Sequence, residues 1–174
     1  TDCNPFWQEI DNPLNIWKTS HGTPEINFYD NAGIYSGPSA LLECNTVNGI
    51  KRSEGLYMNF PFQQNFFYRI TVVGRSDADA DIDTAALVMK MANNIQPNSA
   101  NNCLKEGVPS VNSTKNLNHS DGSTFNVNNE IQTHLIYADQ DYSQFWMYAL
   151  SSTSGSHDYG LEWLEVESVT IEEI

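Results

Sequence analysis

The alternation of apolar and polar residues is clearest at residues 54–73, EGLYMNFPFQQNFFYRITVV. Apolar residues recur at every second position in the first half of this segment, and a period of two returns in the second half. A polar break at Gln63, Gln64 and Asn65 separates the halves. Side chains alternate between the two faces of a β-strand, so the pattern predicts two strands. With so short a break between them, the two strands are expected to form an antiparallel hairpin.

Short segments of the same kind recur along the chain, which shows no long amphipathic helix and no internal repeat. We expect strands at residues 26–29, 39–44, 85–92, 130–138, 144–150 and 160–174. Short strands separated by turns are typical of an all-β protein. The fold class predicted is an antiparallel two-sheet β-sandwich of the jelly-roll kind. Eight residues are expected in its core: Leu56, Phe66, Tyr68, Ile70, Leu87, Met89, Leu135 and Val169.

Length and charge narrow the functional classes. A chain of 174 residues corresponds to a single domain, residues 1–174, and its lack of an initial Met indicates a module excised from a longer secreted protein. The 22 acidic and 8 basic residues give a net charge of −14, which argues against nucleic acid as a partner. No apolar run reaches the roughly 20 residues that span a bilayer, so membrane insertion is not expected. The composition fits a secreted or cell-surface protein.

Three cysteines, Cys3, Cys44 and Cys103, permit one disulfide bond. Cys3 lies near the end of the chain, where fraying is common, so the pairing Cys44–Cys103 is favoured. Such a bond fits an oxidising compartment. None of the cysteines has the spacing of a zinc site.

Carboxylates alternate in the segment SDADADIDT, at Asp77, Asp79, Asp81 and Asp83. Clustered carboxylates are preferred ligands of Ca²⁺. An EF-hand is excluded, because Ile82 and Val88 stand where its Gly and Glu would be. The segment is therefore either a solvated acidic loop or part of a structural Ca²⁺ site.

Aromatic residues supply the candidates for a ligand surface. Trp146 and Tyr148 lie two positions apart in SQFWMYAL and therefore share one face of a strand. That face either packs in a core, with bulky residues on both sides of the sheet, or stacks on sugar rings. Trp17, expected in a loop, would extend such a platform, and His21 and Glu25 would bind sugar hydroxyl groups. The alternative for His21 is an ordinary surface residue.

Motifs of common enzymes are absent. The sequence contains no GxSxG, no HExxH and no glycine-rich phosphate loop. Its four histidines are not spaced as metal ligands. Glycoside hydrolysis needs a pair of carboxylates, and no pair stands out among the 22 acidic residues. The sequence therefore favours a protein that is not an enzyme.

Several segments resemble, in chain order, those of a family of secreted modules. NPF at 4–6 is similar to an N-terminal NPxFE motif, and Trp17 with GTPE at 22–25 is similar to a W…GTPD segment. SGPSA at 36–40 resembles a GxxSG turn, and residues 163–171 resemble a closing lDnVsI strand. The chain thus resembles galactose-binding-domain-like and carbohydrate-binding-module-like β-sandwiches of secreted Bacteroidota proteins.

This resemblance implies a non-catalytic extracellular module that binds glycans or polysaccharides by aromatic stacking. The alternative is an adhesive or structural module that docks on protein, including neighbouring domains of its own polypeptide. A jelly-roll polysaccharide lyase or hydrolase is the third hypothesis. The resemblance also implies structural Ca²⁺, with Glu165 or Glu167 in place of an Asp of the closing strand. The candidate ligands are Asp77, Asp79, Asp81 and Glu165.

Overall fold

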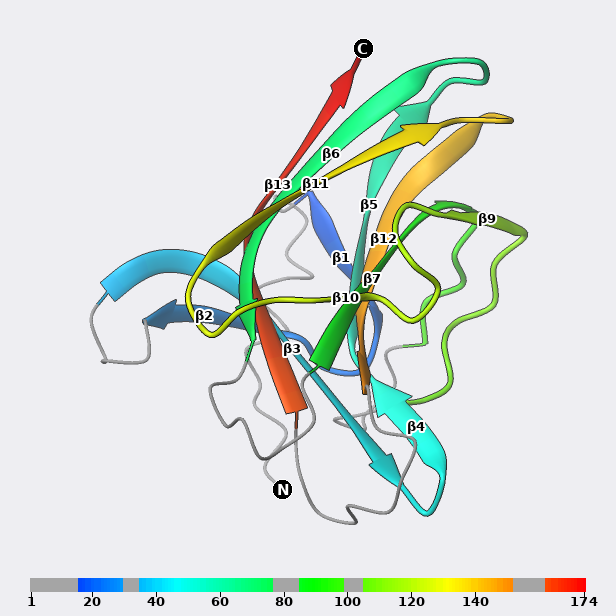
Figure 1. Ribbon diagram of the computed structural model, residues 1–174. Helices are drawn as coiled ribbons and strands as arrows, with labels where there is room; N and C mark the ends of the chain where they lie inside the picture. The colour runs from blue at the N-terminus through cyan, green and yellow to red at the C-terminus, as the bar shows by residue number, and fades with distance from the viewer. Residues whose placement is uncertain (1–15, 30–34, 77–84, 99–104, 152–161) are drawn as a thin grey trace.

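The computed structural model describes residues 16–29, 35–76, 85–98, 105–151 and 162–174. These residues form thirteen β-strands and no helix, so none of them belongs to a helix that crosses a membrane. The strands make two antiparallel sheets that face each other across a shared core (Figure 1). The predicted all-β, two-sheet sandwich is therefore confirmed.

Sheet A has a long strand at its centre, β12 (Tyr142–Ser151). Strand β12 pairs with β5 (Gly55–Phe62) on one side and with β7 (Ala85–Asn93) on the other. Three shorter strands complete the sheet: β1 (Trp17–His21) beside β5, and β9 (Ser113–Asn116) and β10 (Ser123–Thr124) beside β7.

Sheet B is built around β6 (Phe67–Ser76) and β13 (Glu162–Glu173), which pair with each other. Strand β11 (Glu130–Tyr137) borders β6, and β3 (Tyr35–Val47) borders β13. The remaining strands lie beyond β3: β2 (Glu25–Tyr29), β4 (Ile50–Ser53) and, next to β4, β8 (Lys105–Glu106).

The hairpin predicted at residues 54–73 is wrong. Both strands exist, but β5 lies in sheet A and β6 lies in sheet B. The polar break crosses between the sheets: the N–H of Gln63 donates to the Tyr68 hydroxyl at 2.7 Å, and Asn65 takes a φ of 72°. A period of two specifies which face a residue occupies and not which strand pairs with it. Alternation alone therefore cannot distinguish a hairpin from a crossing between sheets.

Five of the eight predicted core residues are at most 2% exposed: Leu56, Tyr68, Ile70, Leu87 and Met89. Val169 is partly buried and packs against them. Two predictions are wrong. Phe66 is 40% exposed because it lies in the crossing before β6 begins. Leu135 is 64% exposed because its register places it beside Arg69 on the outer face, while Ile136 packs on the core.

A second apolar cluster covers the outer face of sheet A, around Val88, Trp146 and Tyr148. Ile95 and Val111, from the segments that follow β7 and precede β9, pack onto this face. The N–H of Ile95 donates to the Gln144 side chain at 2.9 Å, which fixes the covering segment to β12. Strand β12 therefore has packed residues on both of its faces.

Candidate functional site

Trp146 and Tyr148 are core residues rather than an exposed platform. Trp146 is 1% exposed and Tyr148 is 7% exposed. The indole N–H of Trp146 donates to the Ser20 hydroxyl at 3.0 Å, and the two rings lie 4.9 Å apart. Burial raises the pKa of the Tyr148 hydroxyl to about 12. Of the two interpretations of this face, the structure supports packing on both sides of the sheet, because Ile95 and Val111 cover the rings.

His21 is fully buried beside these rings. Its Nδ1 lies 2.9 Å from the Ser20 hydroxyl, and its Nε2 lies 2.9 Å from the Ser53 hydroxyl. The imidazole meets both Trp146 and Tyr148 edge-on. Because this site is desolvated, the pKa of His21 falls to about 3. Both ring nitrogens have partners inside the protein, so His21 is not placed to bind a sugar hydroxyl.

The buried His21 cluster requires a glycine at position 55. A Cβ at Gly55 would lie 2.6 Å from His21 Cε1 and 2.7 Å from both Ser20 Oγ and Tyr148 Cβ. We expect Gly55→Ala to lower the free energy of unfolding by about 1–3 kcal/mol, the usual cost of overpacking. Urea denaturation measures the change, and an unaltered midpoint and slope would show that the cluster adapts without cost.

Glu25 lies apart from the aromatic cluster, in β2 of sheet B, opposite Leu41 of β3. It is half-buried near Glu43, whose pKa is raised by desolvation and then by the charge of Glu25. A third carboxyl, that of Glu54, is 2% exposed and accepts hydrogen bonds from the N–H of Glu43 in β3 and the N–H of Thr23, which precedes β2. This end of the sandwich thus gathers acidic groups, and the structure does not bring Glu25 together with Trp146.

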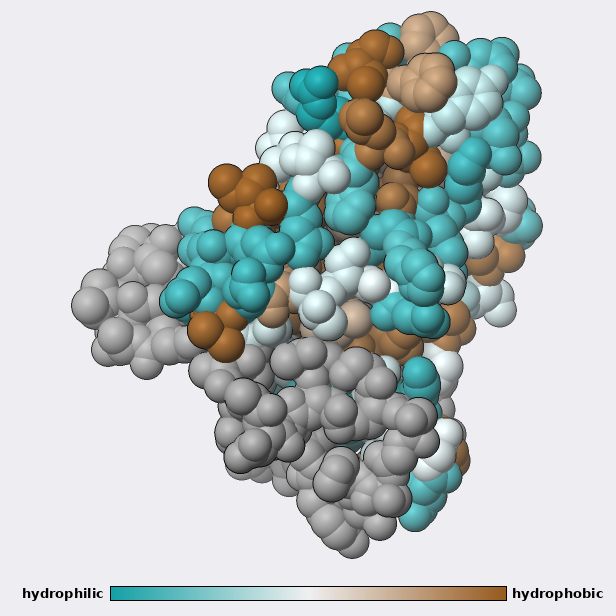
Figure 2. Space-filling view, viewed as in Figure 1, coloured by the Kyte–Doolittle hydropathy of each residue, from teal (hydrophilic) through white to brown (hydrophobic). Residues whose placement is uncertain are grey.

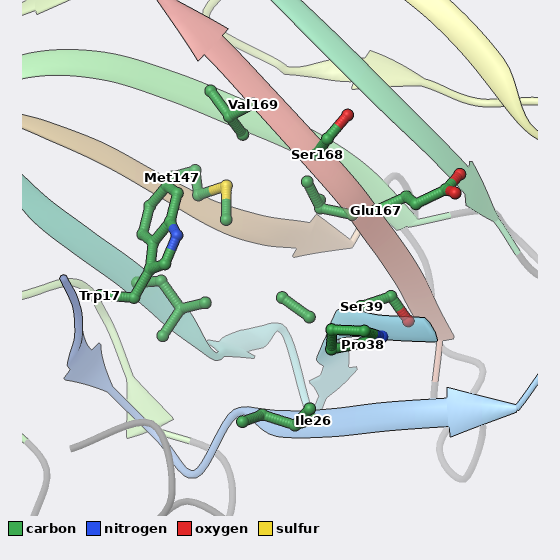
Figure 3. A pocket seen from close by; sticks show the side chains of 11 residues that line it. Trp17, Ile26, Pro38, Ser39, Met147, Glu167, Ser168 and Val169 are labelled. Atoms are coloured by element: carbon green, nitrogen blue, oxygen red, sulfur yellow. The ribbon is translucent and has the colours of Figure 1, made fainter. Parts of the chain in front are cut away.

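Trp17 lies in β1, not in the predicted loop, and lines a cavity of about 280 Å³ between the sheets (Figure 3). Its ring packs edge-on against Phe145 at 6.0 Å. The opposite wall carries Ile26 and Pro38, and the hydroxyl of Ser39 already donates to the carbonyl of Asn27 at 3.3 Å. Few polar groups face this cavity, so it suits a small apolar group better than a sugar ring.

Glu165 is engaged by protein groups. Its carboxylate forms a salt bridge with Arg75 at 2.5 Å and accepts a hydrogen bond from the Asn27 amide. It is 6% exposed, so a cation would have to displace Arg75 to reach it. Asp77, Asp79 and Asp81 lie outside the described residues. In the ranges that the structure covers, no group of three His, Cys, Asp or Glu is placed to hold a metal, and the Ca²⁺ site stays a prediction.

Cys44 is a buried free thiol, so the predicted Cys44–Cys103 disulfide is wrong in this structure. The side chain belongs to the core, and its Sγ lies 3.9 Å from a Glu162 carboxylate oxygen. Desolvation and the neighbouring Glu162 raise the pKa of this thiol well above its usual value. Such a thiol reacts poorly, since the thiolate is the nucleophile. Cys103 lies outside the described residues.

A polar groove of about 850 Å³ opens where β5 ends, between the β5–β6 crossing and the start of β12. We call it the crossover groove. Phe60 and Pro61 contribute apolar surface to it. Its amide, carboxylate and aliphatic hydroxyl side chains are Asn59, Gln63, Gln64, Asn93, Asp141 and Ser143. The hydroxyl of Tyr142, which also lines the groove, donates to Asp139 Oδ1 at 3.0 Å. Sugar hydroxyls are bound by amides, carboxylates and hydroxyls of this kind next to an apolar surface.

The walls of the crossover groove are fixed to one another. The N–H of Gln64 donates to Asp141 Oδ1 at 2.7 Å, and its amide donates to the Asp139 carbonyl at 3.0 Å. The Asn93 amide donates to the carbonyl of Asp141 at 2.9 Å and accepts from the N–H of Ser143 at 2.8 Å. A groove held in this way loses little conformational entropy when a ligand binds.

Unused hydrogen-bonding capacity remains at the rim of the groove. The side chains of Asn59, Gln63 and Asp141 are exposed. The amide of Asn59 has one long contact, 3.5 Å to the amide of Gln144. Sequence reasoning missed this site, although the polar break at Gln63 and Gln64 was a visible signal.

No protein-family model and no curated protein matches this sequence. Among solved structures, the chain is similar to a domain described as "CBM4 structure and function", at 10% identity and a TM-score of 0.46, covering 99% of this chain and 100% of that one. It is also similar to the CBM22-1 xylan-binding domain from Paenibacillus barcinonensis, at 9% identity and a TM-score of 0.47, covering 94% and 89%.

A third similar structure is the enzymatically active domain of tailspike protein 4 of bacteriophage CBA120, at 12% identity and a TM-score of 0.45. The match covers 91% of this chain but only 19% of the tailspike chain. Several of the similar structures are carbohydrate-binding modules, the class named by the sequence resemblance. At these identities and TM-scores, the similarities assign no function to this chain.

Proposed function

We propose that this protein is a non-catalytic, extracellular glycan-binding module, and that the crossover groove binds the sugar. The observation that carries the proposal is the gathering of six amide, carboxylate and aliphatic hydroxyl side chains around Phe60 and Pro61 in one fixed groove. Neutral glycans fit a chain of net charge −14 better than polyanions do. Secretion, a Bacteroidota source and structural Ca²⁺ stay predictions and belong to the same proposal.

The composition of the groove favours binding over cleavage. Glycoside hydrolases generally use two carboxyl groups that flank the scissile bond. Among the described residues that line the groove, Asp141 is the one carboxylate, and it already accepts the N–H of Gln64. We therefore expect no new reducing ends when the protein is incubated with a polysaccharide that it binds.

The direct test is a glycan array followed by titration of the best ligand against a groove variant. A neutral hydrogen bond is worth roughly 1 kcal/mol, so losing two in Asn59→Ala/Gln63→Ala should weaken binding about 30-fold. Neither side chain supports the core, so the melting temperature should hardly change. The matched control is Asn128→Ala, which removes an exposed amide from the bend that precedes β11. This variant should bind the glycan like wild type.

Two results would contradict this function. Equal affinity of the double variant and wild type would move the sugar site away from the crossover groove. Absence of binding on a broad array would favour the second candidate, a protein-docking module. That candidate is supported by a separate surface, the outer face of sheet B, where Phe67, Leu135 and Ile174 are each more than half exposed.

A further inference from the structure

Strand β11 is a border of sheet B, with no further strand beside it in the part of the chain that the structure describes. It pairs with β6 over all eight of its residues without a register shift. The N–H of Ala138, directly after β11, donates to the carbonyl of Phe66 at 3.0 Å. Because bonded pairs alternate along an antiparallel ladder, the even-numbered residues of β11 bond to β6. The backbone N–H and C=O groups of Ile131, Thr133, Leu135 and Tyr137 are therefore directed away from the sheet.

The other border strands in the described ranges do not offer such an edge. Strands β8 and β10 have two residues each. Strands β1 and β2 have five residues each, and a register irregularity interrupts both. Strand β9 has four residues and carries Lys115. Proteins commonly protect sheet edges by short strands, bulges, Lys or Pro, and residues 131–137, IQTHLIY, have none of these.

We propose that β11 pairs in antiparallel orientation with β11 of a second copy of this chain, around a twofold axis at His134. Exchange of two hydrogen bonds by each bonded pair joins the two B sheets into one. This pairing does not rest on glycan binding, because the crossover groove lies at the end of sheet A.

The sequence of β11 is complementary to itself in this register. Residue pairs whose numbers sum to 268 lie opposite each other, which places Ile131 beside Tyr137 of the second copy and Thr133 beside its Leu135. The backbone N–H and C=O groups of these four residues have no partner among the described residues, so these residues form the bonded pairs. Their side chains share the outer face, where Ile131 is 70% exposed and Tyr137 is 37% exposed. An aromatic ring next to a β-branched residue is a favourable cross-strand pair.

Charge permits a second copy at this edge despite the net charge of −14. Residues 131–137 contain no acidic, Lys or Arg side chain, and burial lowers the pKa of His134, which favours the neutral imidazole. Glu130 lies opposite Ala138 of the second copy, so no two carboxylates face each other directly. The remaining repulsion between the two chains is long-range and is screened by salt.

The apolar surface next to the edge continues the proposed interface. Phe67 and Tyr137 pack ring to ring at 5.1 Å, and Ile174 joins them at the end of β13. Figure 2 shows brown apolar residues gathered where β6 begins and where β11 and β13 end, with polar residues beside them. Antiparallel pairing of β11 extends this patch across two molecules.

Sedimentation of the 174-residue chain between micromolar and millimolar concentration tests the proposal. We expect a monomer–dimer equilibrium whose dimer fraction rises with sodium chloride. Thr133→Pro removes an outward N–H that has no partner within the sheet, and Thr133→Lys places a charge at the edge. Each should weaken dimerisation at least tenfold. Thr170→Lys, exposed on the same face but two strands inward, is the matched control and should dimerise like wild type.

Cross-linking identifies the register. A mixture of Thr133→Cys and Leu135→Cys proteins should cross-link through a short bifunctional thiol reagent, and mass spectrometry should find the 133–135 linkage. If the Thr133→Pro variant fails to fold, the dimerisation of Thr133→Lys tests the role of this edge instead. A chain that stays monomeric at every concentration and salt, or an equal effect of Thr133→Lys and Thr170→Lys, would overturn the proposal. Dimers linked elsewhere would overturn it as well.

Discussion

Replacing Trp146 by Ala is expected to destabilise the fold by about 3–5 kcal/mol, the usual cost of removing a buried aromatic side chain. Trp146 is 1% exposed and is packed with Val88, Tyr148 and Ile95. Truncation leaves a cavity on the outer face of sheet A. It also removes the indole N–H that donates a hydrogen bond to the Ser20 hydroxyl. The loss is a large fraction of the total stability of a domain of this size.

Chemical denaturation measures this loss of stability. The variant Trp146→Phe separates the contribution of ring packing from that of the hydrogen bond to Ser20. Phe keeps an aromatic ring but cannot donate to Ser20, so its cost should lie well below that of Ala. Trp17→Ala, at the half-buried border strand β1, is the matched control and should cost less than Trp146→Ala. Under conditions where the variants are folded, all three should bind the glycan as wild type does.

The opposite pattern would restore Trp146 as a sugar-stacking residue. In that case Trp146→Ala would leave the unfolding midpoint nearly unchanged and abolish binding. Such a result would require the segment around Ile95 to leave the rings when the glycan binds.

Local alternation predicted eight of the thirteen described strands and missed the short strands β1, β4, β8, β9 and β10. It could not predict which strands pair with each other. Tyr68 and Ile70 were placed in the core correctly, because a period of two specifies a face. Strands β5 and β6 were joined in a hairpin wrongly, because the choice between a hairpin and a crossing depends on the pairing of β5 with β12. That pairing links residues about 85 positions apart, as in the contact of Asn59 with Gln144, and no local pattern contains it.

The candidate site was harder to predict for the same reason. The sequence showed that Trp146 and Tyr148 share a face, but their cover comes from Ile95 and Val111, which lie between the strands expected at residues 85–92 and 130–138. The crossover groove combines Gln63 from the crossing, Asn93 from the end of β7 and Asp141 from the start of β12. Three chain segments meet there only because sheet A brings the ends of its strands together.

The stability of this protein should depend on pH through two buried groups that act in opposite directions. Burial lowers the pKa of His21 from 6.5 to about 3. Burial raises the pKa of Glu54 from 4.5 to about 8, although the N–H groups of Glu43 and Thr23 donate to its carboxyl oxygens. Both groups are therefore neutral in the folded protein near pH 5.5.

The signs follow from the number of protons bound by each state. Between pH 3 and 6.5 the unfolded chain binds a proton at His21 that the folded chain does not, so stability rises with pH. Between pH 4.5 and 8 the folded chain holds a proton at Glu54 that the unfolded chain has lost, so stability falls with pH. The two contributions cancel between pH 4.5 and 6.5. Below this window only His21 contributes, and above it only Glu54 contributes. There the single contributing group changes the folding equilibrium constant about tenfold per pH unit.

Urea denaturation from pH 3 to 9 tests both groups, with each variant serving as the control for the other. Glu54→Gln removes the decrease in stability that Glu54 causes as the pH rises. The stability of wild type minus that of this variant should therefore decrease from pH 4.5 to 8. His21→Gln removes the increase in stability that His21 causes as the pH rises. The stability of wild type minus that of this variant should therefore increase from pH 3 to 6.5. Comparing each variant with wild type cancels the many exposed carboxylates that both proteins share. Two differences that run parallel with pH, or that stay flat, would mean that these groups titrate alike in the folded and unfolded chains.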